Sequence, residues 1–308
     1  RFAVPATVWP DRREGTLVTY PGTHAQQWPD KPAIVMAGSG DIQTYRELDE
    51  RSNQLAQLFR ANGLHRGDHV ALFMENQLHY MEVAWAALRS GLYLTAINSY
   101  LTAPEVAYII DDCEARLVIS STAKAAVAQA IDPSSTPRVE RWLMVGGATA
   151  TESGPAWEDY DAAINVHPTS AIDDESPGTS MLYSSGTTGR PKGVKVAAPE
   201  VPLGVAPALL MLVTMLFGVT DGCKYLSPAP LYHAAPLRFC MTVQRVGGTV
   251  VVMERFDPED ALRLIEQHQI TTSQWVPTMF VRMLKLDDEV RNSYDVSSLG
   301  VAVHAAAP

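Results

Sequence analysis

The sequence is poor in cysteine: its 308 residues include only Cys113, Cys223 and Cys240, and none of them belongs to a CxxC pair. An odd number of widely spaced cysteines argues against both a disulfide framework and a zinc site. The first residues, RFAVPATVWPDRREG, also lack the charged and apolar regions of a secretory signal. These absences favour reduced thiols and a cytoplasmic location.

Basic residues are also scarce, with 24 Lys and Arg against 34 Asp and Glu and a formal net charge of −10. This balance disfavours nucleic acid as a partner and gives no attraction toward anionic lipid. A small anionic ligand stays compatible with it, because local backbone amides and a single lysine can outweigh a diffuse negative field.

One long stretch carries no charge, residues 201–219 (VPLGVAPALLMLVTMLFGV). Its length is near that of a membrane span, but the prolines and glycine in its first third leave a helical part of only about a dozen residues. We therefore expect a buried helix and no transmembrane segment. Met211 and Met215 are expected to fill gaps in the core rather than to select a substrate.

Signatures of metal and covalent catalysis are missing as well. The eight histidines include no HExxH motif, and a Gly-Asp turn between His65 and His69 should keep these two off a shared helical face. No convincing Ser-His-Asp set is present. We expect no tightly held transition metal.

What the sequence does contain is an alternation of apolar strands and amphipathic helices. Capping boxes at Thr44–Glu47 and Thr102–Glu105 mark two helix starts, and Asp257-Pro258 marks a third. Strands are expected at 33–37, 69–74, 92–97, 116–120, 179–183, 225–227, 248–253, 271–276 and 299–304. This alternation predicts an α/β fold with mainly parallel sheet covered by helices on both faces.

The polar segment 146–177 is rich in Gly, Thr, Ser and acidic residues, which predicts a long irregular connection. We expect it to separate two similar, mainly parallel α/β subdomains, residues 1–170 and residues 171–308. The second subdomain would carry a loop with a distinctive composition.

That loop, residues 183–193, reads YSSGTTGRPKG and follows a short apolar run. Glycines let backbone amides approach an anion closely, hydroxyls add donors, and Lys192 supplies a mobile charge. The pattern is neither a Walker A loop, because proline precedes the lysine and glycine follows it, nor a GxGxxG fingerprint nor a GxSxG elbow. The residues favour an anion-binding loop over a flexible linker, with an ordinary solvated Lys192 as the alternative.

The loop resembles the phosphate-loop signature of the adenylate-forming superfamily, which includes acyl-CoA synthetases, adenylation domains of peptide synthetases and luciferases. Residues 227–233 (SPAPLYH) and 303–308 (VHAAAP) resemble, in order and spacing, that family's acyl-pocket and adenine-binding segments. Residues 44–53 (TYRELDERSN) are similar to another family segment that has no direct chemical role. The resemblance covers nearly the whole chain and is closest to the fatty-acyl and aryl-CoA synthetases.

The resemblance implies an ATP-dependent acyl-CoA synthetase, which activates a fatty or related hydrophobic carboxylic acid as an acyl-adenylate and then transfers it to coenzyme A. Thr188 and Lys192 would be catalytic, and Tyr232 and His233 would bind the substrate. The implied nucleotide-binding residues are Ser184, Ser185, Gly186, Thr187, Thr188, Gly189, Lys192, Ala305, Ala306, Ala307 and Pro308.

Three further substrate-binding candidates come from position in the fold. Trp275, Val276 and Pro277 stand at the carboxyl end of a predicted strand, where ligands of open sheets gather, although core packing is an equal alternative. A packed or half-exposed histidine is likewise the alternative for His233.

Some features depart from the family pattern. Ala198 stands near a position where many relatives carry a histidine, and Ala305 and Ala306 replace the usual glycines. Family members are longer, and no match appears here to the segments that would bind Mg²⁺ and the ribose or to the C-terminal lid domain with its lysine. The resemblance therefore implies that these parts lie outside this chain and that the chain alone is inactive.

Two other functions stay open. The departures at residues 198, 305 and 306 suit a non-catalytic module that binds a nucleotide or an acyl group. An adenylating domain that loads an aryl or amino acid onto a carrier protein would carry the same motifs. The expected partners are a small carboxylic acid, ATP and coenzyme A, and a homodimer is left open.

Overall fold

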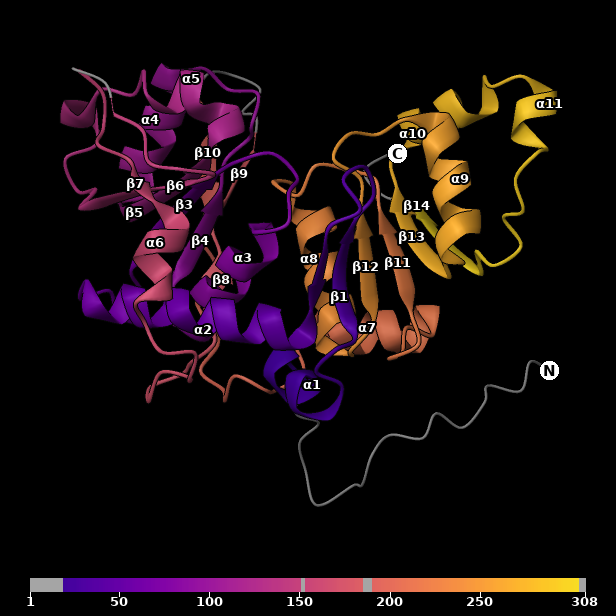
Figure 1. The fold of residues 1–308 in the computed structure, drawn as a ribbon, viewed down its shortest axis with the longest axis horizontal. Coiled ribbons are helices and arrows are strands. Elements are labelled where there is room, and N and C mark those ends of the chain that lie inside the picture. Colours follow the sequence, from indigo (N-terminus) through magenta and orange to yellow (C-terminus); the bar gives the residue numbers. More distant parts are fainter. Residues whose placement is uncertain (1–18, 151–152, 185–189, 305–308) are drawn as a thin grey trace.

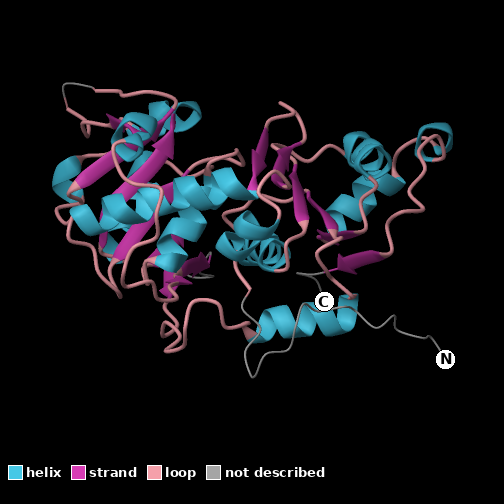
Figure 2. Ribbon diagram, turned by 60° about the horizontal axis from the view of Figure 1, so that its bottom comes forward, coloured by secondary structure: helices cyan, strands magenta, loops and turns pink. Residues whose placement is uncertain are grey.

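The computed structural model describes residues 19–150, 153–184 and 190–304. Within these ranges the chain forms two six-stranded sheets flanked by helices, together with a separate two-stranded hairpin (Figure 1). A turned view shows the helices lying on both sides of the strands (Figure 2). The predicted α/β class with two mainly parallel sheets is confirmed.

The first sheet is parallel throughout and comes from the middle of the chain. In spatial order it contains β7 (Glu158–Asp159), β6 (Arg141–Val145), β5 (Ala115–Ser121), β3 (His69–Phe73), β4 (Tyr93–Ala96) and β8 (Thr179–Ser180). Strands β3 and β4 are buried at every position, as expected for strands of a parallel sheet covered on both faces. The sequence patterns do not predict β6 or β7.

The second sheet is parallel except for one antiparallel pair at its edge. In spatial order it contains β14 (Val301–His304), β13 (Thr272–Trp275), β11 (Lys224–Ser227), β12 (Thr249–Val252), β1 (Pro32–Met36) and β2 (Ile42–Thr44). Strands β1 and β2 come from the N-terminal part of the chain, whereas β8 joins the first sheet although it follows residue 170. The sheets therefore do not divide the chain at residue 170, because β1 pairs with the distant β12.

Helices pack on the outer faces of the sheets and into a core that the two sheets share. The shared core takes apolar residues from α2 (Tyr45–Ala61), α3 (Tyr80–Arg89), α6 (Tyr160–Asn165), α7 (Ala208–Phe217) and α8 (Ala234–Arg245). The first sheet's other core contains α4 (Ala103–Asp112) and α5 (Ala125–Ala128), and the second sheet's other core contains α9 (Pro258–His268) and α10 (Pro277–Leu284). Also described are α1 (Pro21–Gln27), α11 (Asp288–Arg291) and the 3-10 turns η1 (Thr122–Lys124) and η2 (Pro133–Ser135).

Both predicted capping boxes are present. The Thr44 side chain accepts a hydrogen bond from the Glu47 backbone, while the Thr44 backbone N–H donates to the Glu47 carboxylate at 2.7 Å. Thr102 and Glu105 begin α4 in the same way. Each box satisfies amides that have no partner within the helix.

The connection 146–177 is not irregular throughout, because it contains β7 and α6. Tyr160 and Ile164 of α6 are buried in the shared core. These two apolar residues are four positions apart, a helical spacing that the surrounding polar residues hide in the sequence.

The strand expected at 179–183 is divided into two. Its first part, β8, pairs with β4 in the first sheet, while β9 (Leu182–Ser184) leaves that sheet and pairs antiparallel with β10 (Lys192–Val194). The loop between β9 and β10 therefore lies on a hairpin of its own.

The uncharged stretch 201–219 forms the short helix α7. Leu210 is buried, but Met211 and Met215 are 55 % and 80 % exposed. The expectation that these methionines fill the core is therefore wrong, because α7 buries only one face and its uniformly apolar sequence does not indicate which. In the part of the chain that the structure describes, no helix is both long and apolar enough to cross a bilayer.

All three cysteines are buried and free, in agreement with reduced thiols. Burial raises the pKa of the Cys113 thiol to about 11 and that of Cys240 to about 12. Both thiols therefore stay protonated at neutral pH and are poor nucleophiles.

Candidate functional site

The predicted site segments gather at the carboxyl edge of the second sheet. Strand β11 ends at Ser227, and the last residues of β13 and β14, Trp275 and His304, are paired in register. The carboxyl ends of parallel strands are the edge at which open α/β sheets bind their ligands. The segment 228–233 directly follows β11, and the segment 276–277 directly follows β13. Both segments therefore begin at that edge.

Tyr232 and His233 lie between β11 and α8, with ring centres 4.2 Å apart. His233 is exposed and immediately precedes α8, while Tyr232 is half-buried. The Tyr232 ring also contacts Tyr100, which follows β4 of the first sheet, at 6.4 Å. Lys124, beyond β5, places its ammonium 5.5 Å from the Tyr100 ring. The carboxyl edges of the two sheets therefore meet at Tyr100 and Tyr232.

Trp275 is packed in the core and is only 1 % exposed. Its ring contacts Phe256 at 6.4 Å and Phe280 at 5.7 Å. Val276 precedes α10 and Pro277 begins it, and both are half-buried. The structure thus favours the core-packing alternative for the Trp275 side chain, and pocket roles for Val276 and Pro277 stay predictions.

The predicted phosphate loop connects the strands of the β9–β10 hairpin. The register pairs Ser184 with Lys192, so the two described ends of the loop lie side by side. Lys192 is exposed at this position. The other nucleotide-binding candidates lie outside the described residues: Ser185, Gly186, Thr187, Thr188, Gly189, Ala305, Ala306, Ala307 and Pro308.

Helix α4 holds the base of this hairpin. The Tyr183 hydroxyl donates to Asp112 Oδ2 at 2.5 Å, and the Tyr108 hydroxyl donates to the Pro191 carbonyl at 3.2 Å. The Arg190 guanidinium lies over the Tyr108 ring at 5.0 Å. Burial and the bond to Asp112 raise the pKa of Tyr183, so its hydroxyl stays a donor at neutral pH. On the α4 side these contacts come from Tyr108 and Asp112, which the sequence patterns do not single out.

Gly193 gives the Tyr183 ring the space it needs. A β-carbon at Gly193 would lie 2.9 Å from Cζ and 3.0 Å from the hydroxyl of Tyr183, which is closer than such atoms normally approach. The glycine that follows Lys192 is therefore required for packing the hairpin, independently of any role in binding phosphate.

Asn76 is a buried residue that links the two sheets, and it too has no signal in the sequence. Its Nδ2 donates to the carbonyls of Ala229 and Met253 at 3.2 and 2.8 Å, and its Oδ1 accepts from the Leu231 N–H at 2.7 Å. Because Asn76 lies just beyond β3 of the first sheet, it fixes the segment before Tyr232 to that sheet.

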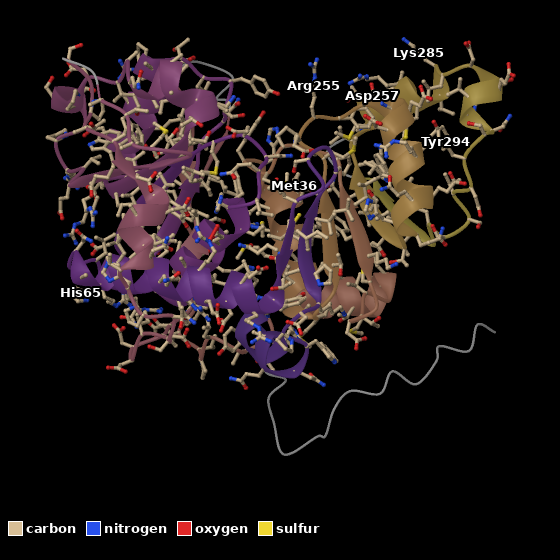
Figure 3. The ribbon with its side chains drawn as sticks, in the orientation of Figure 1. Met36, His65, Arg255, Asp257, Lys285 and Tyr294 are labelled. Atoms are coloured by element: carbon tan, nitrogen blue, oxygen red, sulfur yellow. The ribbon has the colours of Figure 1, made fainter. Side chains whose placement is uncertain are left out.

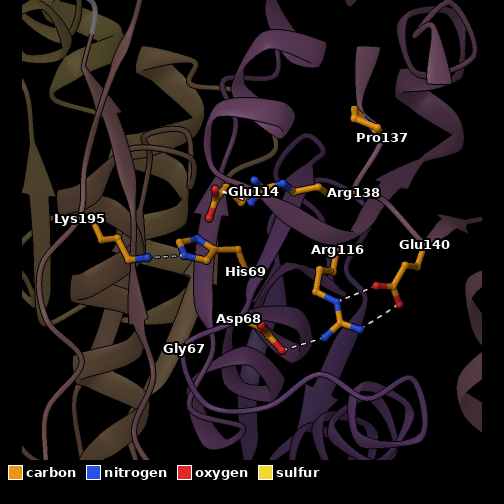
Figure 4. A pocket seen from close by; sticks show the side chains of 9 residues that line it. All are labelled: Gly67, Asp68, His69, Glu114, Arg116, Pro137, Arg138, Glu140 and Lys195. Atoms are coloured by element: carbon orange, nitrogen blue, oxygen red, sulfur yellow. Dashed lines mark hydrogen bonds and ion pairs between the residues drawn. The ribbon is translucent and has the colours of Figure 1, made fainter. Parts of the chain in front are cut away.

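A charged pocket of about 330 Å³ lies at the opposite edge, where β3 and β5 begin (Figure 4). It is lined by Gly67, Asp68, His69, Glu114, Arg116, Pro137, Arg138, Glu140 and Lys195. Arg116 bonds to Asp68 and Glu140, both at less than 3 Å. Arg138 pairs with Glu114. The charges of this pocket compensate one another, and the pocket lies away from the carboxyl edges of the sheets. We therefore do not assign it to the candidate site.

His69 in this pocket is held neutral. Lys195 Nζ donates to His69 Nε2 at 2.8 Å, and the imidazole stacks on Tyr93 at 4.6 Å. Burial and the nearby ammonium lower the pKa of His69 to about 4. A neutral imidazole can accept a hydrogen bond, so Lys195 anchors the segment beyond β10 to the first sheet.

A mainly apolar cavity of about 520 Å³ lies between α8 and the first sheet. Its wall includes Leu237, Arg238, Met241, Thr242 and Arg245 of α8, together with residues of α3, β4, β8 and the segment 199–209. Its size and lining are those of a small-molecule site. The cavity therefore lies alongside α8, the helix that begins directly after His233.

The sequence matches the family model described as AMP-binding enzyme over residues 22–308. It is 32 % identical over 295 residues to the fatty acid–[acyl-carrier-protein] ligase ScoC of Streptomyces coeruleorubidus, with 95 % of this chain and 54 % of that protein covered. It is 29 % identical to a feruloyl-CoA synthase of Amycolatopsis, with 96 % and 55 % covered. The chain therefore spans about half the length of these relatives.

The fold is also found among solved structures. The inhibitor-bound N-terminal domain of FACL13 from Mycobacterium tuberculosis superposes with a TM-score of 0.75 at 23 % identity, covering 94 % of this chain and 70 % of that one. At this identity the likeness concerns the fold alone. The family match over nearly the whole chain decides the classification: the chain belongs to the AMP-binding enzymes of the adenylate-forming superfamily.

Proposed function

We propose that the full-length protein is an ATP-dependent acid–thiol ligase, which converts a hydrophobic carboxylic acid into an acyl-adenylate and then transfers the acyl group to coenzyme A. The observation that carries this proposal is the family match over residues 22–308. The hairpin that pairs Ser184 with Lys192 supports it, because it brings together both ends of the predicted phosphate loop.

In the first step the carboxylate attacks the α-phosphorus of ATP and pyrophosphate leaves. Two anions must approach each other, so the barrier is largely electrostatic and orientational. We assign the departing phosphates to the amides near Gly186 and Gly189, the hydroxyls of Thr187 and Thr188, and the Lys192 ammonium. In the second step the coenzyme A thiol displaces AMP from the acyl-adenylate.

Mg²⁺ would accompany ATP and neutralise part of the phosphate charge. Among the residues that the structure describes, no group of three or more His, Cys, Asp or Glu side chains is placed to hold a metal ion. We therefore assign no metal ligand within 19–150, 153–184 or 190–304, and the steps assigned to this chain concern only phosphate and acid binding.

The proposed acid binds with its carboxylate near Tyr232 and His233 and its tail along α8. The apolar cavity beside α8 supports a hydrophobic tail, since Leu237 and Met241 line it one and two turns beyond His233. The named relatives act on fatty acids and on ferulate, both of which combine a carboxylate with an apolar body.

A carrier protein is the second candidate for the thiol acceptor. The relative that favours it is ScoC, a fatty acid–[acyl-carrier-protein] ligase 32 % identical to this chain. Supplying the full-length protein with either coenzyme A or a phosphopantetheinylated carrier protein, and measuring the acyl thioester by mass spectrometry, separates the two acceptors.

Acid-dependent ATP–pyrophosphate exchange in the full-length protein tests the proposal. We expect Lys192→Ala to lower the exchange rate on the order of 100-fold, because loss of one preorganised donor costs about 3 kcal/mol in the transition state. Lys285→Ala, an exposed lysine at the end of α10, should leave the rate unchanged (Figure 3).

Absence of acid-dependent exchange over a broad panel of acids would refute the ligase and favour a non-catalytic module. Such a module should still bind ATP in a calorimetric titration while producing no AMP.

A further inference from the structure

Two positively charged side chains, Arg238 and Arg245, line the cavity beside α8. Among the described residues that line it, none is Asp or Glu. The two arginines are seven positions apart, so they lie on the same face of the helix. The rest of the wall is mostly apolar, which makes two guanidinium groups an unexpected feature of its surface.

Arg245 is the more constrained of the two, with only 7 % of its surface exposed. Its guanidinium lies 5.3 Å from the Trp85 ring, and its Nη1 donates to the Thr19 carbonyl at 2.7 Å. In the described part of the chain it makes no ion pair, and burial lowers its pKa to about 10. A charge removed from water without a counter-ion is unfavourable, so the site as folded favours an incoming anion.

Arg238 stands closer to the start of α8 and is exposed. Its Nη2 is 3.4 Å from the Ser180 hydroxyl, at the long end of the hydrogen-bond range. The other N–H groups of the Arg238 guanidinium can therefore donate to a ligand, and arginine can bind a carboxylate with two parallel hydrogen bonds.

We propose that this cavity binds an acid whose far end carries a second carboxylate held by Arg245, while Arg238 lies nearer the reacting end. The substrate class is then the long ω-dicarboxylic acids rather than simple fatty acids. This inference rests on the proposed ligase function, because it takes His233 as marking the reacting end. With a rise of 1.5 Å per residue, Arg245 lies about 18 Å along α8 from His233, which suits a long chain, whereas Arg238 lies only about 8 Å from His233.

A comparison of hexadecanedioate with hexadecanoate in the full-length protein tests this assignment. We expect kcat/KM for acid-dependent pyrophosphate release to favour the diacid by about tenfold or more, the size expected for hydrogen bonds to a charged group. Arg245→Met should abolish that preference by lowering kcat/KM for the diacid much more than kcat/KM for hexadecanoate. Arg245→Lys, which keeps the charge, should retain part of it.

Arg282→Met is the matched control, because Arg282 also lies over an aromatic ring, that of Phe256 at 4.9 Å, but does not line the cavity. It should leave the preference intact. Equal turnover of the two acids by the unchanged protein, or an equal loss of both in Arg245→Met, would overturn the assignment.

If no acid is turned over, the ligase proposal fails and calorimetry decides the cavity separately. Binding of hexadecanedioate that is stronger than binding of hexadecanoate, and that is lost in Arg245→Met, would keep the anion site. Equal binding of both acids would exclude it.

Discussion

At the scale of single residues, His69 makes the stability of the fold depend on pH. Its pKa falls from the ordinary 6.5 to about 4 in the folded chain. Between these values the unfolded chain binds a proton that the folded chain does not, so the stability present above pH 6.5 is lost as the pH falls toward 4. The full loss from this one residue is about 3 kcal/mol.

We expect His69→Gln to reduce that pH dependence, because a glutamine oxygen can accept from Lys195 without titrating. Urea unfolding at pH 7 and pH 4.5 measures the change in the free energy of unfolding between these pH values. Comparing this change in the variant and the parent cancels the contributions of the other titrating groups. His65→Gln, at an exposed histidine, should behave like the parent (Figure 3). An unchanged difference between the two pH values in His69→Gln would contradict the assignment.

Some residues of the candidate site stand out in the sequence and others do not, for a physical reason. The predicted phosphate loop is a continuous run of glycines, hydroxyls and lysine, so it is visible locally. Asn76 acts through partners 153 and 177 positions away, and no local pattern encodes such contacts. The pairing of Tyr183 with Asp112 is non-local in the same sense.

At the scale of elements, we expect α4 to orient the proposed phosphate loop through the Tyr183–Asp112 bond. Tyr183→Phe should raise the KM for ATP by roughly tenfold, the cost of one hydrogen bond to a charged acceptor, and leave the KM for the acid unchanged. The separate variant Asp112→Asn keeps an acceptor for the Tyr183 hydroxyl, so it should retain most of the affinity for ATP. Steady-state kinetics of the full-length protein supply both constants.

Combining Tyr183→Phe with Asp112→Ala should weaken ATP binding no further than either change alone, because both remove the same bond. Tyr294→Phe is the control, since Tyr294 makes a similar bond to Glu259 at 2.9 Å beside α9, away from the hairpin (Figure 3). Additive effects would show that the two residues act separately.

Helix α7 gives a prediction about its two faces. Met215→Gln should change the free energy of unfolding by less than about 0.5 kcal/mol, because the side chain is 80 % exposed. Leu210→Ala on the buried face should cost about 2–5 kcal/mol. Urea denaturation measures both, and a large loss in Met215→Gln would mean that its side chain is covered in solution.

At the scale of the whole molecule, Asn76 links the two sheets. Asn76→Ala leaves the Leu231 N–H and the carbonyls of Ala229 and Met253 without their partner, which should lower the free energy of unfolding by about 2–4 kcal/mol. Asn98→Ala, which removes only a local bond to the Tyr100 N–H, should cost less. Similar losses in both variants would argue against a linking role.

The sequence predicts the classes of most elements better than their arrangement. Runs such as HVALF are apolar enough to identify β3, and paired Thr and Glu residues identify the starts of α2 and α4. Sheet membership depends on which strands pair, which the alternation of elements does not specify. The pattern therefore does not reveal that β1 and β2 belong to the second sheet rather than the first.

The position of β1 has a consequence for the order in which the molecule is made. Gly38, just beyond β1, donates to Glu254, a residue 216 positions further along the chain. During synthesis β1 and β2 can pair with each other, but the edge of β1 that pairs with β12 must wait until β12 has left the ribosome, while the first sheet can already assemble. Such long-range closure is slow, and until then this open strand edge can pair with a wrong partner.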